Sequence, residues 1–90
     1  MSRVLAIVSV LGRDQKGVVA RISTYLADQD INIEDIEQRV VRGQFLMDML
    51  VDITGATVSL DELVVGLLAI GREIDMEIRV TLHNKRERPK

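Results

Sequence analysis

The segment from Gly12 to Val18 has the residue types best suited to bind a small anion. It follows a run of apolar residues, reads Gly-Arg-Asp-Gln-Lys-Gly, and leads into apolar residues at helical spacing. Backbone N–H groups at the start of a helix attract carboxylate or phosphate groups, because these N–H groups have no partner within the helix. Asp14 is a predicted N-cap, which places Gly17 at the third helical position, where a ligand or partner can approach the backbone closely.

The sequence has few of the residues that metal binding or nucleophilic catalysis requires. The chain has no cysteine, and His83 is its one histidine, so a metal site and a Ser-His-Asp or Cys-His catalytic set both lack ligands or partners. Glu34 and Asp35 are neighbours on a predicted strand and point to opposite faces, so they do not form an acid–base pair. The sequence therefore predicts a protein that is not an enzyme and that needs no metal and no cofactor.

An acylphosphatase-like hydrolase is an alternative, because Arg13 and Arg21 accompany a loop of the phosphate-binding type. Members of that family also need an asparagine near the end of the second strand or in the turn after it. This chain has Val-Arg-Gly-Gln from Val41 to Gln44, and the carboxylate of Asp14 would repel a phosphate. The loop alone supports this alternative weakly.

The composition indicates one domain of residues 1–83, followed by a charged, disordered tail of residues 84–90. The chain has 90 residues, of which 47% are hydrophobic and 2% aromatic, so aliphatic side chains must form the core. Residues 1–84 include 8 basic and 13 acidic residues, and this acidic body does not favour nucleic acid as a partner. No apolar run approaches the roughly 20 residues that cross a bilayer, so we expect no membrane association and a cytoplasmic protein.

The periodicity of apolar residues predicts four strands and two helices. The first helix follows Asp14 and ends near Asp30, and the second begins at a capping box formed by Ser59 and Glu62. The strands are predicted over residues 3–11, 31–41, 45–53 and 76–82, with a bulge near Glu34 and a tight turn at Arg42-Gly43. With right-handed crossovers, this order gives an α+β, ferredoxin-like βαββαβ sandwich. Its four-stranded antiparallel sheet has the order 4-1-3-2, with both helices on one face.

An apolar patch is expected on the face of the sheet that the helices leave open. Strand alternation places Leu5, Ile7, Leu46 and Leu50 together there. A small domain rarely leaves such a patch in water, so we expect a partner on this face, most simply a second copy of the chain.

The loop and the segments that follow it resemble the ACT domain family. The resemblance extends through Leu82 and is carried by residues 12–23, by Leu26-Ala27, and by Ile31-Asn32-Ile33. The stretch from Asn32 to Gln38 is most similar to small standalone ACT-domain proteins, and also to the N-terminal ACT domain of formyltetrahydrofolate deformylase. ACT domains typically sense an amino acid or a related metabolite, so the resemblance implies a non-catalytic regulatory domain with such a ligand.

The resemblance also implies a site shared by two subunits. ACT domains often dimerise through sheet edges and hold their ligand between the first loop of one subunit and the second-strand start of the other. Asp14 and Asn32 would then bind an ammonium group, while the loop backbone binds a carboxylate. The implied binding residues are Gly12, Arg13, Asp14, Gln15, Lys16, Gly17 and Val18, facing Asn32 and Ile33.

Two features of the sequence keep other functions open. Lys16 and Asp30 stand where many family members have proline and glycine, which leaves the identity of the ligand and the assembly undecided. The loop can also be a turn before a capped helix, with Gly17 serving only helix–sheet packing. The protein would then be a ligand-free interaction module that regulates a partner protein. The sequence does not name the ligand or the partner, and it does not separate a dimer from a tetramer.

Overall fold

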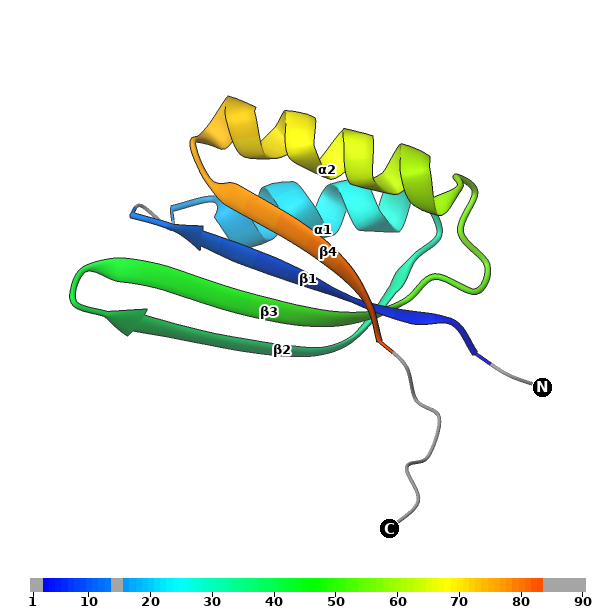
Figure 1. The fold of residues 1–90 in the computed structure, drawn as a ribbon, viewed down its shortest axis with the longest axis horizontal. Coiled ribbons are helices and arrows are strands. Elements are labelled where there is room, and N and C mark those ends of the chain that lie inside the picture. The colour runs from blue at the N-terminus through cyan, green and yellow to red at the C-terminus, as the bar shows by residue number, and fades with distance from the viewer. Residues whose placement is uncertain (1–2, 14–15, 84–90) are drawn as a thin grey trace, which may run out of the picture.

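A four-stranded sheet covered on one face by two helices makes up the described part of the chain, residues 3–13 and 16–83 of a computed structural model (Figure 1). The elements are β1 (Leu5–Gly12), α1 (Val18–Asp28), β2 (Asn32–Val41), β3 (Gln44–Asp52), α2 (Leu60–Ile74) and β4 (Glu77–His83). All neighbouring strands are antiparallel, in the order β2-β3-β1-β4. The predicted ferredoxin-like topology is therefore confirmed.

Aliphatic side chains on the helix-facing side of the sheet form the core. The alternating residues of β1 and β3 point toward the helices, and each helix presents one apolar stripe to them. Phe45 is the one aromatic side chain that is fully buried among these residues. The remaining core residues include Ala6, Val8, Val10, Ile22, Leu26, Met47, Met49, Val51, Leu63 and Leu67. This packing fixes the loop before α1 at one end of the sheet and the start of β2 at the other.

The hairpin of β2 and β3 agrees closely with the prediction from the sequence. Its register shifts between Ile33 and Asp35, which confirms the predicted bulge near Glu34. The turn is formed by Arg42 with φ 53° and Gly43 with φ 79°. Positive φ at both central residues is typical of the tight turns whose twist matches that of the strands, so the predicted turn is also confirmed.

The face of the sheet without helices differs from prediction at one residue. Ile7, Leu46 and Leu50 are half-buried there, as expected for a partly exposed apolar patch. Leu5, by contrast, is 2% exposed although it lies outside the core cluster under the helices. The patch therefore begins at Ile7. The predicted tail, residues 84–90, lies outside the described residues.

None of the helices in residues 3–13 and 16–83 combines the length and the apolar character needed to cross a membrane.

Candidate functional site

The loop between β1 and α1 starts the helix later than predicted. α1 begins at Val18, and Gly17 is its N-cap, with φ 75° and ψ −3°. The prediction that placed an N-cap at Asp14 and Gly17 inside the helix is therefore wrong. The left-handed conformation explains why glycine stands at this position, because a side chain is strained there. Asp14 and Gln15, two of the predicted binding residues, lie outside the described residues.

The two glycines that flank the loop have different roles. A Cβ on Gly12 would collide with the sulfur of Met76, so a larger residue here requires the flexible Met76 side chain to move. A Cβ on Gly17 would meet no atom within 4 Å. Gly17 is thus required by its backbone conformation rather than by helix–sheet packing, and the space beside it is open.

The start of α1 offers backbone donors and leaves them without a side-chain cap. Among the described residues no side chain accepts a hydrogen bond at this N-terminus, and the first turn holds no acidic residue. Val18 is 2% exposed and belongs to the core, whereas Gly17 before it is exposed. Arg13 and Lys16 are exposed beside it. Together with the partial positive charge of a helix N-terminus, these residues favour an anion.

Arg21, in the first turn of α1, is held by the end of α2. Its Nε lies 3.1 Å from Glu73 Oε2, and a terminal nitrogen lies 2.9 Å from Oε1, which makes a bidentate pair. The hydrogen bond from Arg21 lowers the pKa of the Glu73 carboxyl. The acylphosphatase-like alternative needs Arg21 for a phosphate, but here the guanidinium is engaged by a carboxylate.

The start of β2 holds the second group of predicted residues. Asn32 is exposed, and its Nδ2 donates to Glu34 Oε2 at 2.9 Å, which commits the amide donor and leaves the carbonyl oxygen as an acceptor. Ile33 is half-buried and packs against the core, so its side chain is not a polar contact. Asn32 is therefore the member of this pair that can bind a polar ligand group.

A polar cluster around Asn32 was not predicted. Arg3 lies 3.6 Å from Glu34 and 3.7 Å from Asp52, which is the strand partner of Asn32. Thr54 N–H donates to Asp52 at 2.9 Å, and hydrogen bonds from the Thr54 side chain and backbone lower the pKa of Asp52. The Asp-x-Thr spacing after a strand is the sequence signal for such a turn. The ion pairs of Arg3 join residues far apart in sequence and carry no such signal.

The two groups of predicted residues lie at opposite ends of the sheet within one chain. β1 and β2 run in the same direction, because both are antiparallel to β3. Gly12 is therefore level with Phe45, whereas Asn32 is level with Asp52. These rows are separated by roughly 23 Å, the length of seven residues of strand. A single chain does not bring the loop and Asn32 together, and a shared site needs two chains.

The chain matches a known family and several known proteins. Residues 5–81 match the ACT domain family. The chain is 45% identical over 75 residues to a UPF0237 protein of Methanopyrus kandleri, covering 83% of each chain. It is 44% identical over 80 residues to a UPF0237 protein of Methanocaldococcus jannaschii, covering 89% of this chain and 87% of the relative.

Two solved structures have the same fold. An ACT domain protein from Streptococcus pneumoniae superposes with a TM-score of 0.80 at 28% identity, covering 90% of this chain and 91% of that one. A formyltetrahydrofolate deformylase from Pseudomonas syringae superposes with a TM-score of 0.78 at 24% identity, covering 91% of this chain and 28% of the deformylase. The second likeness concerns the fold alone.

Proposed function

This chain belongs to the ACT domain family, and on that premise we propose that it is a non-catalytic domain that binds an amino acid or a related metabolite at a homodimer interface. Membership of the family supports a regulatory, ligand-binding role in general. The observation that carries the specific proposal is the start of α1, where no side chain of the described residues caps the helix and the N-cap residue Gly17 is exposed. The binding domain is residues 1–83, and the cytoplasmic setting expected from the sequence remains a prediction.

The carboxylate of the ligand binds at the loop. The first N–H groups of a helix have no carbonyl partner within it. A carboxylate there also gains from the helix dipole and from the nearby charges of Arg13 and Lys16. Gly17 leaves room for this approach, since a Cβ there would meet no atom within 4 Å.

The ammonium group of the ligand binds at the start of the partner's β2. The side-chain nitrogen of Asn32 donates to Glu34, so the side-chain carbonyl oxygen is the atom that can accept a hydrogen bond from the ligand. Glu34 and Asp52 lie beside it and share one cation, Arg3, so the two carboxylates leave a net negative charge that favours a second cation. Asp14 is the second proposed acceptor, contributed by the loop. The two charged groups of the ligand are thus bound by residues of two chains.

The free edge of β2 supports a dimer that builds this site. Within the described chain β2 pairs with β3 alone, and Ile36 and Val40 are 38% and 62% exposed. Both lie on the helix-facing side, level with buried Met49 and Phe45. Antiparallel pairing of two β2 strands would extend the sheet and cover these side chains. It would also reverse one copy, bringing its Asn32 end toward the other copy's loop.

A ligand screen by thermal unfolding tests the proposal. The full chain is heated with each of the twenty amino acids at several concentrations. A ligand at about 100 times its dissociation constant adds about 2.7 kcal/mol to the free energy of unfolding, which raises the midpoint by several degrees. Asp14→Ala and Asn32→Ala should abolish the shift. Asp28→Ala, which removes an exposed carboxylate at the far end of α1, should leave it intact.

Mixing the two inactive variants tests whether the site is shared. When Asp14→Ala and Asn32→Ala chains exchange subunits, each mixed dimer regains one intact site, so calorimetry should recover about a quarter of the sites. Recovery of none, with subunit exchange confirmed, contradicts a site built from two chains. If the full screen gives no ligand, the proposal fails in favour of a ligand-free interaction module.

A further inference from the structure

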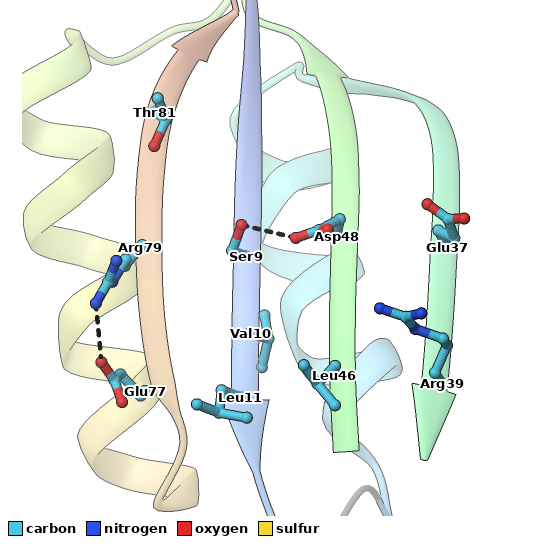
Figure 2. A pocket seen from close by; sticks show the side chains of 10 residues that line it. All are labelled: Ser9, Val10, Leu11, Glu37, Arg39, Leu46, Asp48, Glu77, Arg79 and Thr81. Atoms are coloured by element: carbon cyan, nitrogen blue, oxygen red, sulfur yellow. Dashed lines mark hydrogen bonds and ion pairs between the residues drawn. The ribbon is translucent and has the colours of Figure 1, made fainter. Parts of the chain in front are cut away.

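The face of the sheet opposite the helices is an ordered grid of side chains. Cross-strand pairing puts Glu37, Asp48, Ser9 and Arg79 in one row, and Arg39, Leu46, Leu11 and Glu77 in the next. Figure 2 shows these two rows running from β2 across β3 and β1 to β4. They line a shallow cavity of about 370 Å³. The row that precedes them holds Asp35, Leu50, Ile7 and Thr81.

The centre of this grid is apolar and incompletely covered. Leu46 and Leu50 of β3 stand beside Leu11 and Ile7 of β1, each in direct cross-strand register. Leu11 is 38% exposed, and the other three are half-buried. Ser9 and Asp48, the polar pair between them, already satisfy each other through a 2.7 Å hydrogen bond. The centre therefore suits a complementary apolar surface.

The two edges of the grid carry charges in opposite order. Along β2 the acid Glu37 precedes the base Arg39, and in the same two rows of β4 the base Arg79 accompanies the acid Glu77. Glu37 and Arg39 have no ion pair or hydrogen bond with any other described residue. Arg79 lies 3.6 Å from Glu77, with both side chains mostly exposed. One edge is thus the charge complement of the other, row by row.

We propose that a second copy of the chain covers this face about a two-fold axis parallel to the strands, pairing Glu37 with the partner's Arg79 and Arg39 with the partner's Glu77. Such an axis lays β2 over the partner's β4 and β3 over the partner's β1, and each row faces its own counterpart. Leu46 then faces the partner's Leu11, and Leu50 faces the partner's Ile7. Four ion pairs surround a centre in which two apolar rows flank the polar pair of Ser9 and Asp48.

The symmetry itself fixes the register of this interface. A two-fold axis parallel to the strands permits no shift along them, because a shift would turn the rotation into a screw. The other face-to-face arrangement, with the axis perpendicular to the strands, pairs Glu37 with the partner's Arg39. It also sets the Asp48 carboxylate against the partner's Leu46, which buries a charge on an apolar surface. The parallel axis avoids that mismatch.

The side chains are long enough to meet across the interface. Packed sheets lie about 10 Å apart and cross at about 30°. That crossing shifts the facing positions on edge strands by roughly 4 Å, since each edge lies about 7 Å from the axis. Extended arginine and glutamate side chains together span this gap. The sheet offers roughly 450 Å² per copy in projection, or about 900 Å² in total, so we expect a weak interface below the standard size.

Charge reversal with sedimentation equilibrium tests the axis directly. Glu37→Arg places two arginines together and should weaken self-association through this face by about tenfold or more. Adding Arg79→Glu restores the pair with opposite signs, so the double variant should return to within about threefold of the unaltered chain. The matched control, Glu37→Arg with Arg39→Glu, has the same net charge and should remain weak. Circular dichroism checks that every variant keeps its fold.

Each other result overturns the proposal. Recovery in the control but not in the first double variant indicates the perpendicular axis. Equal association of all four chains, or a monomer at several hundred micromolar, shows that no second copy covers this face. This interface is separate from the proposed ligand site. The ligand site needs the loop of one chain beside the partner's Asn32, whereas this axis places both loops at the same end of the assembly. If no ligand binds but the second charge reversal still restores self-association, only the ligand proposal is contradicted.

Discussion

The two helices of this domain begin in opposite ways. α2 starts at Ser59, whose Oγ accepts the Glu62 N–H at 3.1 Å while the Glu62 carboxylate accepts the Ser59 N–H at 2.9 Å. Asp61 and Glu62 also place negative charge in its first turn. α1 starts at Gly17 in a left-handed conformation, and no side chain of the described residues caps it. One helix start is satisfied by its own residues, and the other is left open.

This difference separates a structural helix start from a binding one. A capping box satisfies two backbone donors and stabilises the helix without any ligand. An uncapped start leaves its donors to water, which a carboxylate can replace with the added attraction of the helix dipole. The same backbone chemistry is therefore used for stability at α2 and is available for recognition at α1.

The largest expected effect comes from Gly17→Ala. The φ of 75° places a Cβ in a strained conformation, so the free energy of unfolding should fall by about 1.5 kcal/mol. The strain is conformational, since the new Cβ meets no atom within 4 Å. Urea unfolding at a fixed protein concentration measures the change.

Gly55→Ala is the matched control for that substitution. A Cβ on Gly55 also meets no atom within 4 Å, but Gly55 does not have a positive φ. Both changes reduce the freedom of the unfolded chain equally, so the difference between them reports the strain at Gly17. Gly17→Asn should recover part of the loss, because asparagine tolerates the left-handed region. Equal effects at Gly17 and Gly55 would show that the start of α1 has no special backbone requirement.

The sequence predicted α2 and failed at α1 for a physical reason. The capping box is a local pattern, with Ser59 and Glu62 three residues apart, and the strands follow from an equally local alternation. The six-residue segment before α1 offers two alternatives, a side-chain cap at Asp14 or a left-handed cap at Gly17, and local preference permits both. Local sequence preference therefore does not determine where α1 begins.

In the candidate site, too, some residues could be predicted from the sequence, whereas contacts between distant residues could not. Asn32 and Gly17 were implicated as binding residues by the family resemblance, which extends through Leu82. The pairing of Arg21 with Glu73 joins residues 52 positions apart, and neither residue type predicts the other. The complementary charges of β2 and β4 likewise become visible only once the strand order and register place them in common rows.

Ser59→Ala tests the satisfied helix start and should have a somewhat smaller effect. Loss of the hydroxyl removes one acceptor and half of the capping box, which lowers the free energy of unfolding by about 1 kcal/mol. Glu62→Gln is the control, because an amide oxygen can still accept the Ser59 N–H. Ligand binding should stay unchanged in both variants. A capping variant that abolished ligand binding while the domain remained folded would contradict the division of roles between the two helix starts.

The pair of Arg21 and Glu73 connects the start of α1 to the end of α2 and gives the smallest expected effect. Each residue sits at the end of its helix where the dipole disfavours its charge: the cation is in the first turn of α1 and the anion in the last turns of α2. Pairing with each other offsets both mismatches. Because both side chains are largely exposed, at 40% and 55%, the pair contributes only modestly to stability.

The pH dependence of Glu73→Gln isolates this contribution. Hydrogen bonding to Arg21 lowers the pKa of Glu73 below its ordinary value of 4.5, so folding is favoured by the ionised form. The stabilisation is therefore complete above the unfolded pKa and is lost as the pH falls through the lower, folded one. Unfolding midpoints of the unaltered chain and the variant should differ near pH 7 and converge as the pH falls below 4.5 and through the lower, folded pKa. Arg21→Gln should give the same profile, and combining the two changes should add little, because either one removes the pair. If the midpoints still differed at low pH, the lost stability would come from packing of the Glu73 side chain and not from its charge interaction with Arg21.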